Sequence, residues 1–253
     1  MQLTDTHCHI HSTEYPLDAE EVYQRAIVSG VSKMIVVGTD VEDSKVAVDW
    51  ASTHDGSWAA IGVHPHEAKH GINGIEQLLK NVDHRGSIVA IGEIGLDYYY
   101  DHSARDVQAH ILESQIQLAV DYDMPIIFHV REAFDDFWPI IDNFPTLRGV
   151  LHSFTDSQSH LERALQYGFF IGVNGIVSFT KDTRQIDMFS NIPVDRILLE
   201  TDAPYLTPKS SRGRVNEPVF VREVAESISS VKSTSVDMLA LQTTRNATFL
   251  FHI

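Results

Sequence analysis

Short apolar runs alternate with amphipathic stretches from one end of the chain to the other. The apolar runs are the length of single strands, and we expect strands at Leu3–His7, Lys33–Val37, Trp58–Ile61, Ile88–Ile91, Ile126–Phe128, Gly149–Leu151, Phe169–Val173 and Arg196–Leu199. The amphipathic stretches predict helices at Asp18–Val28 (with Asp18 as N-cap), Val41–Ser52, Ala104–Tyr122, Ala133–Ile141, Ser157–Tyr167, Thr183–Phe189, Pro218–Ser229 and Val236–Leu250.

This alternation predicts an α/β fold. Strands that are short, nearly all apolar and separated by helices are typical of a parallel sheet that is buried on both faces. Roughly eight such units in a chain of this length are what a (β/α)8 TIM barrel contains. We therefore expect one barrel domain over residues 1–253. A doubly wound open sheet is the alternative, but a Rossmann unit is disfavoured because no G-x-G-x-x-G follows the first strand.

Polar side chains gather where the predicted strands end. In a barrel these ends open onto one face, where catalytic groups collect. Five strand ends carry groups that bind metals or protons, namely His7 with His9, Glu93 with Asp97 further on, His129 with Arg131, His152, and Glu200 with Asp202. We expect them to meet in space.

The kinds of side chain at these ends indicate a metal centre. One polar residue after a buried strand is common and is usually structural, but five ends that all carry ligand types are much less expected by chance. Four histidines with a glutamate and an aspartate exceed what one tetrahedral zinc ion needs. They suit a two-metal site with open positions for water and substrate. Glu93 is the natural bridge, because each carboxylate oxygen can bind a different ion.

Several neighbouring residues allow two readings. Cys8 alternates with His7 and His9, so on a strand it points away from them and is better read as a small buried residue. The run Tyr98–Tyr100 is suited equally to stacking on a base and to covering the barrel mouth. Arg131 is in phase with His129 and suits a phosphate, although Glu132 or Asp135 can also pair with it. Arg212 and Arg214 are either solvated loop charges or substrate contacts.

Composition limits the possible partners. The chain has 35 acidic and 19 basic residues, a formal charge of −16, which argues against a broad basic surface that coats DNA. A phosphate substrate remains compatible if bound metal supplies positive charge locally. The single cysteine excludes an internal disulfide, and neither a signal peptide nor a membrane span is visible, so we expect a cytoplasmic protein without membrane contact.

The order of the motifs resembles the TatD family of metal-dependent hydrolases along nearly the whole chain. The stretches that carry the resemblance are DTHCHI, GVHPH (Gly62–His66), GEIGLDYY (Gly92–Tyr99), PIIFHVREAFDD (Pro125–Asp136), LHSFT (Leu151–Thr155), LLETDAPYL (Leu198–Leu206), NEP (Asn216–Pro218) and NATFLF (Asn246–Phe251). The resemblance implies a (β/α)8 barrel that binds divalent metals and hydrolyses phosphodiesters, typically as a DNase. It implies a first metal held by His7, His9, Glu93 and Asp202, and a second held by Glu93, His129 and His152.

The implied mechanism assigns further roles. Two ions (Mg²⁺, Mn²⁺ or Zn²⁺) would activate a water molecule, with Asp202 and Glu93 as the catalytic carboxylates and Asp202 taking the proton. Asp5 and Glu200 are candidates to orient ligating histidines. His64 and Arg131 would bind phosphate oxygens. The negative charge favours a small end-on site, hence exonuclease action on single-stranded DNA ends at the barrel mouth. For an enzyme of the TatD type we expect the 3′–5′ direction.

Two departures and two alternatives remain open. His11 stands where the family usually has Asp or Asn, so we read it as a substrate-side or structural residue, and Val215 replaces a usual Arg. An amidohydrolase acting on amides, esters or phosphotriesters shares the barrel, but commonly bridges its metals with a carboxylated Lys. An inactive metal-binding scaffold is the non-enzymatic alternative. The sequence leaves the oligomeric state open, with a monomer as one option.

Overall fold

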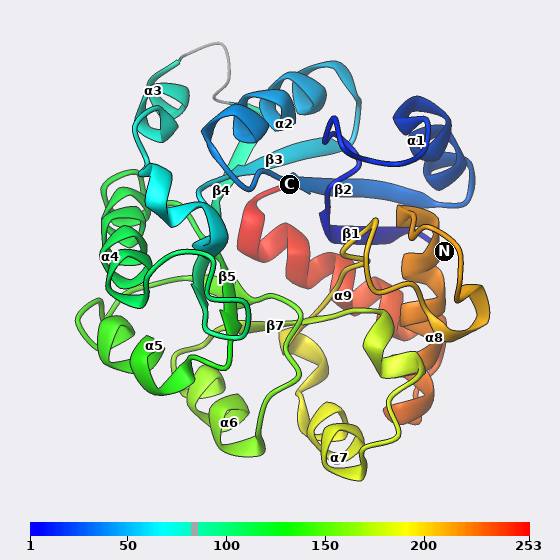
Figure 1. Ribbon diagram of the computed structural model, residues 1–253. Coiled ribbons are helices and arrows are strands. Elements are labelled where there is room, and N and C mark those ends of the chain that lie inside the picture. Colours follow the sequence, from blue (N-terminus) through cyan, green and yellow to red (C-terminus); the bar gives the residue numbers. More distant parts are fainter. Residues whose placement is uncertain (82–85) are drawn as a thin grey trace. The chain divides into compact units, whose positions relative to one another are not determined.

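The computed structural model describes residues 1–81 and 86–253. Its strands are all linked in chain order into one parallel sheet, from β1 to β8. Their bounds are β1 Leu3–Cys8, β2 Val31–Val37, β3 Ser57–Ile61, β4 Ile88–Asp97, β5 Ile126–Arg131, β6 Gly149–Leu151, β7 Phe170–Val173 and β8 Ile197–Leu199. Helices alternate with them (Figure 1) at α1 Ala19–Val28, α2 Val41–Thr53, α3 Ile75–Lys80, α4 Arg105–Asp121, α5 Phe134–Ile141, α6 Gln158–Gln166, α7 Thr183–Asn191, α8 Val221–Val231 and α9 Val236–Phe251.

The strand order confirms the predicted (β/α)8 TIM barrel. A doubly wound sheet reverses its strand order, whereas these strands follow the chain without reversal. The residues that follow β8 return to β1, where Cys8 and Ala203 form a parallel bridge. An open sheet has two edge strands, and this return of the last strand to the first is the closure that a barrel requires.

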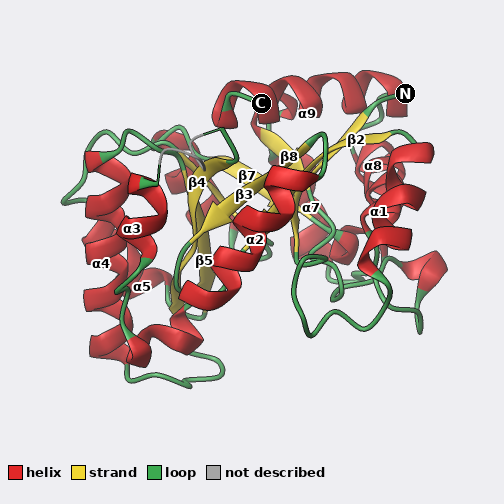
Figure 2. Ribbon diagram, turned by 90° about the horizontal axis from the view of Figure 1, so that it is seen from above, coloured by secondary structure: helices red, strands yellow, loops and turns green. Residues whose placement is uncertain are grey.

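The chain divides into two compact units. The first comprises Met1–Val36 and Ser153–Ile253, and in it α9 packs on β1 and β8. The second comprises Val37–His152, where α4 packs on β4 and α5 on β5 (Figure 2). The single-domain expectation for residues 1–253 stays a prediction.

Most predicted elements are present with ends that shift by one or two residues. Asp18 caps α1 as predicted, since its carboxylate accepts from the Glu21 N–H at 3.0 Å. The predicted end of the fourth strand at Ile91 is wrong, because β4 continues to Asp97. The predicted helix Pro218–Ser229 begins as a 3₁₀ turn, Pro218–Phe220, before α8.

The helices also bear on membrane contact. Among the helices of the described residues, none combines the length and the apolar character that crossing a bilayer requires.

Candidate metal centre

In the first unit, backbone hydrogen bonds place β1 beside the segment that follows β8. The Asp202 N–H donates to the His7 carbonyl at 2.9 Å, and the His9 N–H donates to the Ala203 carbonyl at 2.8 Å. These bonds fix the two histidines and the aspartate at one strand end, although they lie near opposite ends of the sequence. His7 and His9 are both buried.

The three side chains converge as metal ligands do. Nε2 of His7 lies 3.2 Å from Nε2 of His9. Oδ1 of Asp202 lies 3.7 Å from Nε2 of His7 and 3.5 Å from Nε2 of His9. Zn–N and Zn–O bonds of about 2.0–2.2 Å separate neighbouring ligand atoms by roughly this amount. These three residues, here called the first cluster, can hold one ion.

Buried polar groups fix the backbone beneath the first cluster. Asp5 accepts from the N–H of His7 at 3.3 Å, and from the N–H and hydroxyl of Thr201 at 2.9 and 2.6 Å. Asp5 was expected to orient His7; these bonds act on the backbone of both ligand-bearing segments. Burial raises the pKa of Asp5 to about 7, although the bonds from Thr201 and His7 lower it. Asp202 has a left-handed φ of 60°, a conformation that is uncommon outside glycine and concentrates at functional sites.

Cys8 lies in the core, as its alternation with His7 and His9 predicts. Cys8 is fully buried and its thiol lies 3.7 Å from the Ile35 carbonyl. Burial raises the pKa of this thiol, which disfavours the thiolate that a metal needs. His11 is also buried, with its ring centroid 6.4 Å from that of His9.

In the second unit, three imidazoles surround the carboxylate of Glu93. Oε1 of this buried side chain lies 2.8 Å from Nδ1 of His129, 3.3 Å from Nε2 of His152 and 3.7 Å from Nε2 of His64. We call these four residues the second cluster. They come from β4, β5 and the segments after β6 and β3. Glu93, His129 and His64 form a second group that can hold an ion.

Asp97 forms a hydrogen bond with the ring nitrogen of His129 that points away from Glu93. Oδ2 of Asp97 lies 3.0 Å from Nε2 of His129 and 3.1 Å from Nε2 of His66. Burial alone would raise the pKa of Asp97, but the hydrogen bonds from these rings hold it below its usual range, so the carboxylate is ionised and only accepts. His129 therefore donates from Nε2 and presents Nδ1 to Glu93, which is the arrangement of carboxylate, histidine and metal in metalloenzymes.

The sequence did not assign Asp97 this role. The available signal was its phase, since Glu93, Gly95 and Asp97 alternate on one face once β4 continues past Ile91. Gly95 makes the arrangement possible, because a Cβ there would lie 1.7 Å from the His129 carbonyl oxygen. Only glycine permits β4 to approach β5 so closely.

His64 has a different hydrogen-bonding state from His129. Its Nδ1 accepts from the His66 N–H at 3.1 Å, so the neutral ring carries its proton on Nε2. The pKa of His64 is held well below 6.5, mainly by burial and further by the positive charges of His129 and His66. The negative charges of Glu93 and Asp97 act in the opposite direction but are outweighed, so the ring is neutral. Nε2 could bind an ion only if its proton moved to Nδ1, and that nitrogen already accepts from the His66 N–H. His64 thus fits its predicted role toward a phosphate oxygen better than that of a ligand.

The remaining predicted residues lie beside the clusters. Glu200 is buried and accepts from the N–H of Ser153 at 2.6 Å. Ser153 is the residue that follows His152 in the chain. Arg131 is exposed, and its guanidinium carbon lies 4.0 Å from the centroid of the Tyr99 ring. In the described part of the chain, neither Glu132 nor Asp135 forms an ion pair with Arg131.

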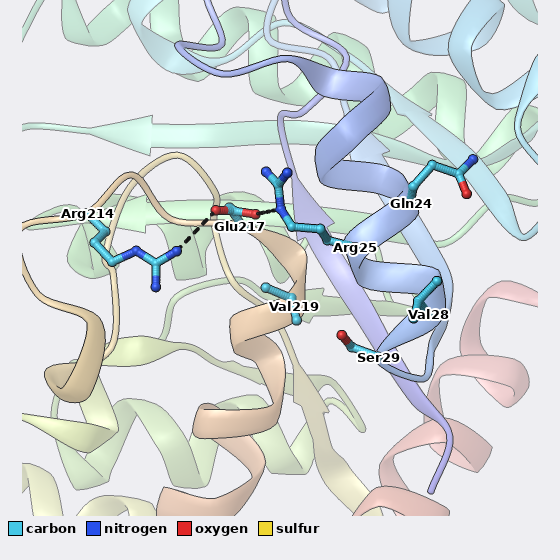
Figure 3. Close-up of a pocket in the computed structure, with 7 residues that line it drawn as sticks. All are labelled: Gln24, Arg25, Val28, Ser29, Arg214, Glu217 and Val219. Carbon is cyan, nitrogen blue, oxygen red and sulfur yellow. Dashed lines mark hydrogen bonds and ion pairs between the residues drawn. The ribbon is translucent and has the colours of Figure 1, made fainter.

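The loop arginines engage the protein itself. Arg212 donates to the Thr207 carbonyl at 3.2 Å, and Arg214 lies 3.8 Å from Glu217. A pocket of about 370 Å³ lies beside these residues. Arg25 and Arg214 approach Glu217 from two sides in it (Figure 3). The Glu217 charge is thereby matched by guanidinium groups, and the pocket contains none of the predicted ligands.

Comparisons with known proteins agree over almost the whole chain. The model of the family described as TatD related DNase matches residues 4–252. The uncharacterized metal-dependent hydrolase YabD of Bacillus subtilis is 36% identical, with 99% of each chain covered. The 3′-5′ ssDNA/RNA exonuclease TatD of Erwinia tasmaniensis is 35% identical, covering 98% of this chain and 99% of its own.

A solved structure supports the same relationship. The crystal structure of the TatD homologue YjjV from Escherichia coli K12 superposes with a TM-score of 0.91 at 31% identity, covering 99% of this chain and 98% of that one. The fold predicted from the strand pattern is therefore that of a solved TatD homologue.

Proposed function

The chain belongs to the family of TatD-related DNases and is a metal-dependent hydrolase, and from this premise we propose that it is a 3′–5′ exonuclease acting on single-stranded DNA ends. The name of the Erwinia tasmaniensis relative states this polarity and extends it to RNA.

The first cluster is the observation that carries the proposal. Two imidazole nitrogens that face each other at 3.2 Å repel one another unless a proton or a cation lies between them. Asp202 brings a negative oxygen to the same place. A divalent cation satisfies all three groups, and imidazole with carboxylate is a donor set that Zn²⁺ or Mn²⁺ accepts.

The second cluster supplies the donors for another ion. We propose that Glu93, His129 and His152 hold it and that Glu93 also serves the first ion, as the family resemblance implies. Such ions, when bound, lower the pKa of water and polarise phosphoryl oxygens. Two ions per chain are thus expected, and Mg²⁺, Mn²⁺ and Zn²⁺ are the candidates.

The protein's own groups complete the chemistry. Asp202 is less buried than Glu93, with 14% against 5% of its side chain exposed, so its carboxylate can accept the proton of the attacking water. His64 donates from Nε2 to a phosphate oxygen. Arg131, exposed and beside the second cluster, offers a bidentate contact to phosphate. Asp5 and Glu200 position the backbone around His7 and after His152.

The charge of the protein supports an end-on substrate. A net charge of −16 opposes binding along an extended groove, whereas a short site beside bound cations accepts the end of a strand.

Shortening of a labelled strand tests the proposal. Metal-reconstituted protein with Mg²⁺ or Mn²⁺ should degrade a 5′-labelled single strand stepwise from its 3′ end. Asp202→Asn should abolish this cleavage, while the same substitution at the exposed Asp237 should leave it intact. An active Asp202→Asn protein with unchanged metal content would contradict the proposal. Hydrolysis of amides or phosphotriesters in place of nucleic acid would favour the amidohydrolase alternative. The absence of any turnover would favour an inactive metal-binding scaffold.

A further inference from the structure

Two exposed tyrosines and an arginine form a surface beside the second cluster. Tyr99 and Tyr100 follow β4 directly and are 54% and 51% exposed. The guanidinium carbon of Arg131, at the end of β5, lies 4.0 Å from the ring centroid of Tyr99 and 4.9 Å from that of Tyr100. We call these three residues the aromatic platform. Large aromatic side chains are usually buried, so exposure of two in sequence needs an explanation.

The platform is held in a fixed position relative to the candidate metal ligands. Oδ1 of Asp97 accepts from the N–H groups of Tyr99 and Tyr100 at 3.0 and 3.1 Å. The other oxygen of the same carboxylate accepts from Nε2 of His129 at 3.0 Å. Asp97 also pairs with Arg131 in the β4–β5 ladder. One buried carboxylate thus fixes both the exposed rings and a proposed ligand.

Aromatic rings connect the platform to the second cluster without a break. The His129 and His64 centroids lie 4.4 Å apart, those of His64 and His66 4.3 Å, and those of His66 and Tyr100 5.4 Å. Tyr99 and Tyr100 follow at 4.8 Å. A strand whose phosphodiester lies at the second cluster would therefore have its neighbouring base within reach of the platform.

The charge of Arg131 is available to a ligand. In a chain with 35 acidic residues, this exposed guanidinium has no ion pair with any described carboxylate. Two aromatic faces and a cation without a carboxylate partner match one nucleotide, with a ring for the base and a guanidinium for the phosphate.

We propose that the aromatic platform binds a nucleobase of the single-stranded substrate by stacking on Tyr99 or Tyr100, while Arg131 contacts the adjoining phosphate. The proposal rests on the proposed nuclease function and adds to it a requirement for a base near the cleaved bond. Exposed tyrosine and arginine also occur at protein interfaces. The unbroken row of rings leading to the second cluster favours a ligand that reaches the reacting group.

Paired strands and paired variants test this. Two 5′-labelled oligonucleotides of equal length would be used, one with thymidine and one with stable abasic residues at its last three 3′ positions, so that they carry equal numbers of phosphates. Affinity would be measured by fluorescence anisotropy in the Asp202→Asn background, where cleavage does not interfere. We expect Asp202→Asn protein to prefer the base-bearing strand by at least fivefold, since stacking on one aromatic ring contributes roughly 5- to 150-fold.

The variants separate a stacking role from a structural one. Adding Tyr99→Ala and Tyr100→Ala should remove the preference and leave affinity for the abasic strand unchanged, whereas Tyr99→Phe with Tyr100→Phe should keep it. Phe249→Ala, which removes an exposed ring of α9, should also keep it.

The proposed role of the aromatic platform would be contradicted by any of three results. These are equal binding of both strands, binding of neither strand, and a preference that persists in the variant with both tyrosines replaced by alanine. A change of oligomeric state in the alanine pair, with strand preference intact, would assign the surface to an interface between copies instead. If protein with intact Asp202 cleaves neither strand, and the Asp202→Asn protein still prefers the base-bearing strand, the proposed nuclease function is contradicted. The proposed role of the aromatic platform is then supported.

Discussion

The imidazole of His129 lies between two carboxylates, with Nε2 3.0 Å from Asp97 and Nδ1 2.8 Å from Glu93. Asp97 is 1% exposed and is engaged by the protein alone, whereas Glu93 belongs to the second cluster. The ring is thereby oriented with one nitrogen committed to the scaffold and the other directed at the proposed ion.

Removal of Asp97 should weaken metal binding without touching a ligand. In Asp97→Ala, His129 loses its orienting acceptor, and we expect a 10- to 100-fold lower affinity for one ion. Isothermal titration with Mn²⁺ measures this, and Asp136→Asn, which alters an acid that accepts from the Tyr98 hydroxyl, serves as the control. Unchanged affinity would show that the orientation of His129 does not depend on Asp97.

Metal affinity should fall as the solution becomes acidic. Burial opposes the charge on His129, but hydrogen bonds with Asp97 and Glu93 raise its pKa above 6.5 in the metal-free protein. Below that raised pKa the ring holds two protons, and an ion must displace the one on Nδ1 before it can bind. We expect the logarithm of the association constant to drop by about one per pH unit below this point and to level off above it. A profile that is flat from pH 6 to 9 would contradict the proposed role of His129.

The raised pKa of His129 also makes the stability of the metal-free protein depend on pH. A histidine with a raised pKa stabilises the metal-free fold fully below the unfolded pKa, and this contribution disappears as pH rises through the folded value. Metal-free protein should therefore lose part of its stability just where metal binding strengthens.

Gly95→Ala should disrupt the second cluster through the backbone. Its Cβ would meet the His129 carbonyl at 1.7 Å, which forces β4 away from β5. We expect a loss of at least about 2 kcal/mol in the free energy of unfolding, measured by denaturant titration, together with weaker metal binding. Gly86→Ala, where a Cβ meets nothing within 4 Å, should change stability little. Equal stability of both variants would show that the strands can separate at low cost.

His64→Ala distinguishes a hydrogen-bond donor from a ligand. Because Nε2 bears the proton, the variant should keep its full metal content and lose about 100-fold in kcat/KM on oligonucleotides. Elemental analysis of the reconstituted protein provides the check. Loss of one ion per chain would instead make His64 a ligand, as its 3.7 Å approach to Glu93 also allows.

The sequence predicted more of the fold than of the site. Alternating apolar strands and helices predict a parallel sheet that is buried on both faces, and the number of units favoured a barrel over a doubly wound sheet. The rule that strand ends share one face brought His7 and His9 to Asp202, as the structure does. The rest depends on geometry that the sequence does not display. The phase of Asp97 requires β4 to continue past Ile91, and the proton on His64 is set by the backbone of His66.

The pairing of Cys8 with Ala203 also means that the first cluster is assembled from residues that are made far apart in time during synthesis. Two residues of the first cluster, His7 and His9, are among the first ten of the chain, whereas the third, Asp202, follows β8. A growing polypeptide that already contains Glu93, His129 and His152 still lacks Asp202, so the first cluster is the later of the two to be completed. A proteolytic fragment that loses either end should lose part of the first cluster and keep the residues of the second.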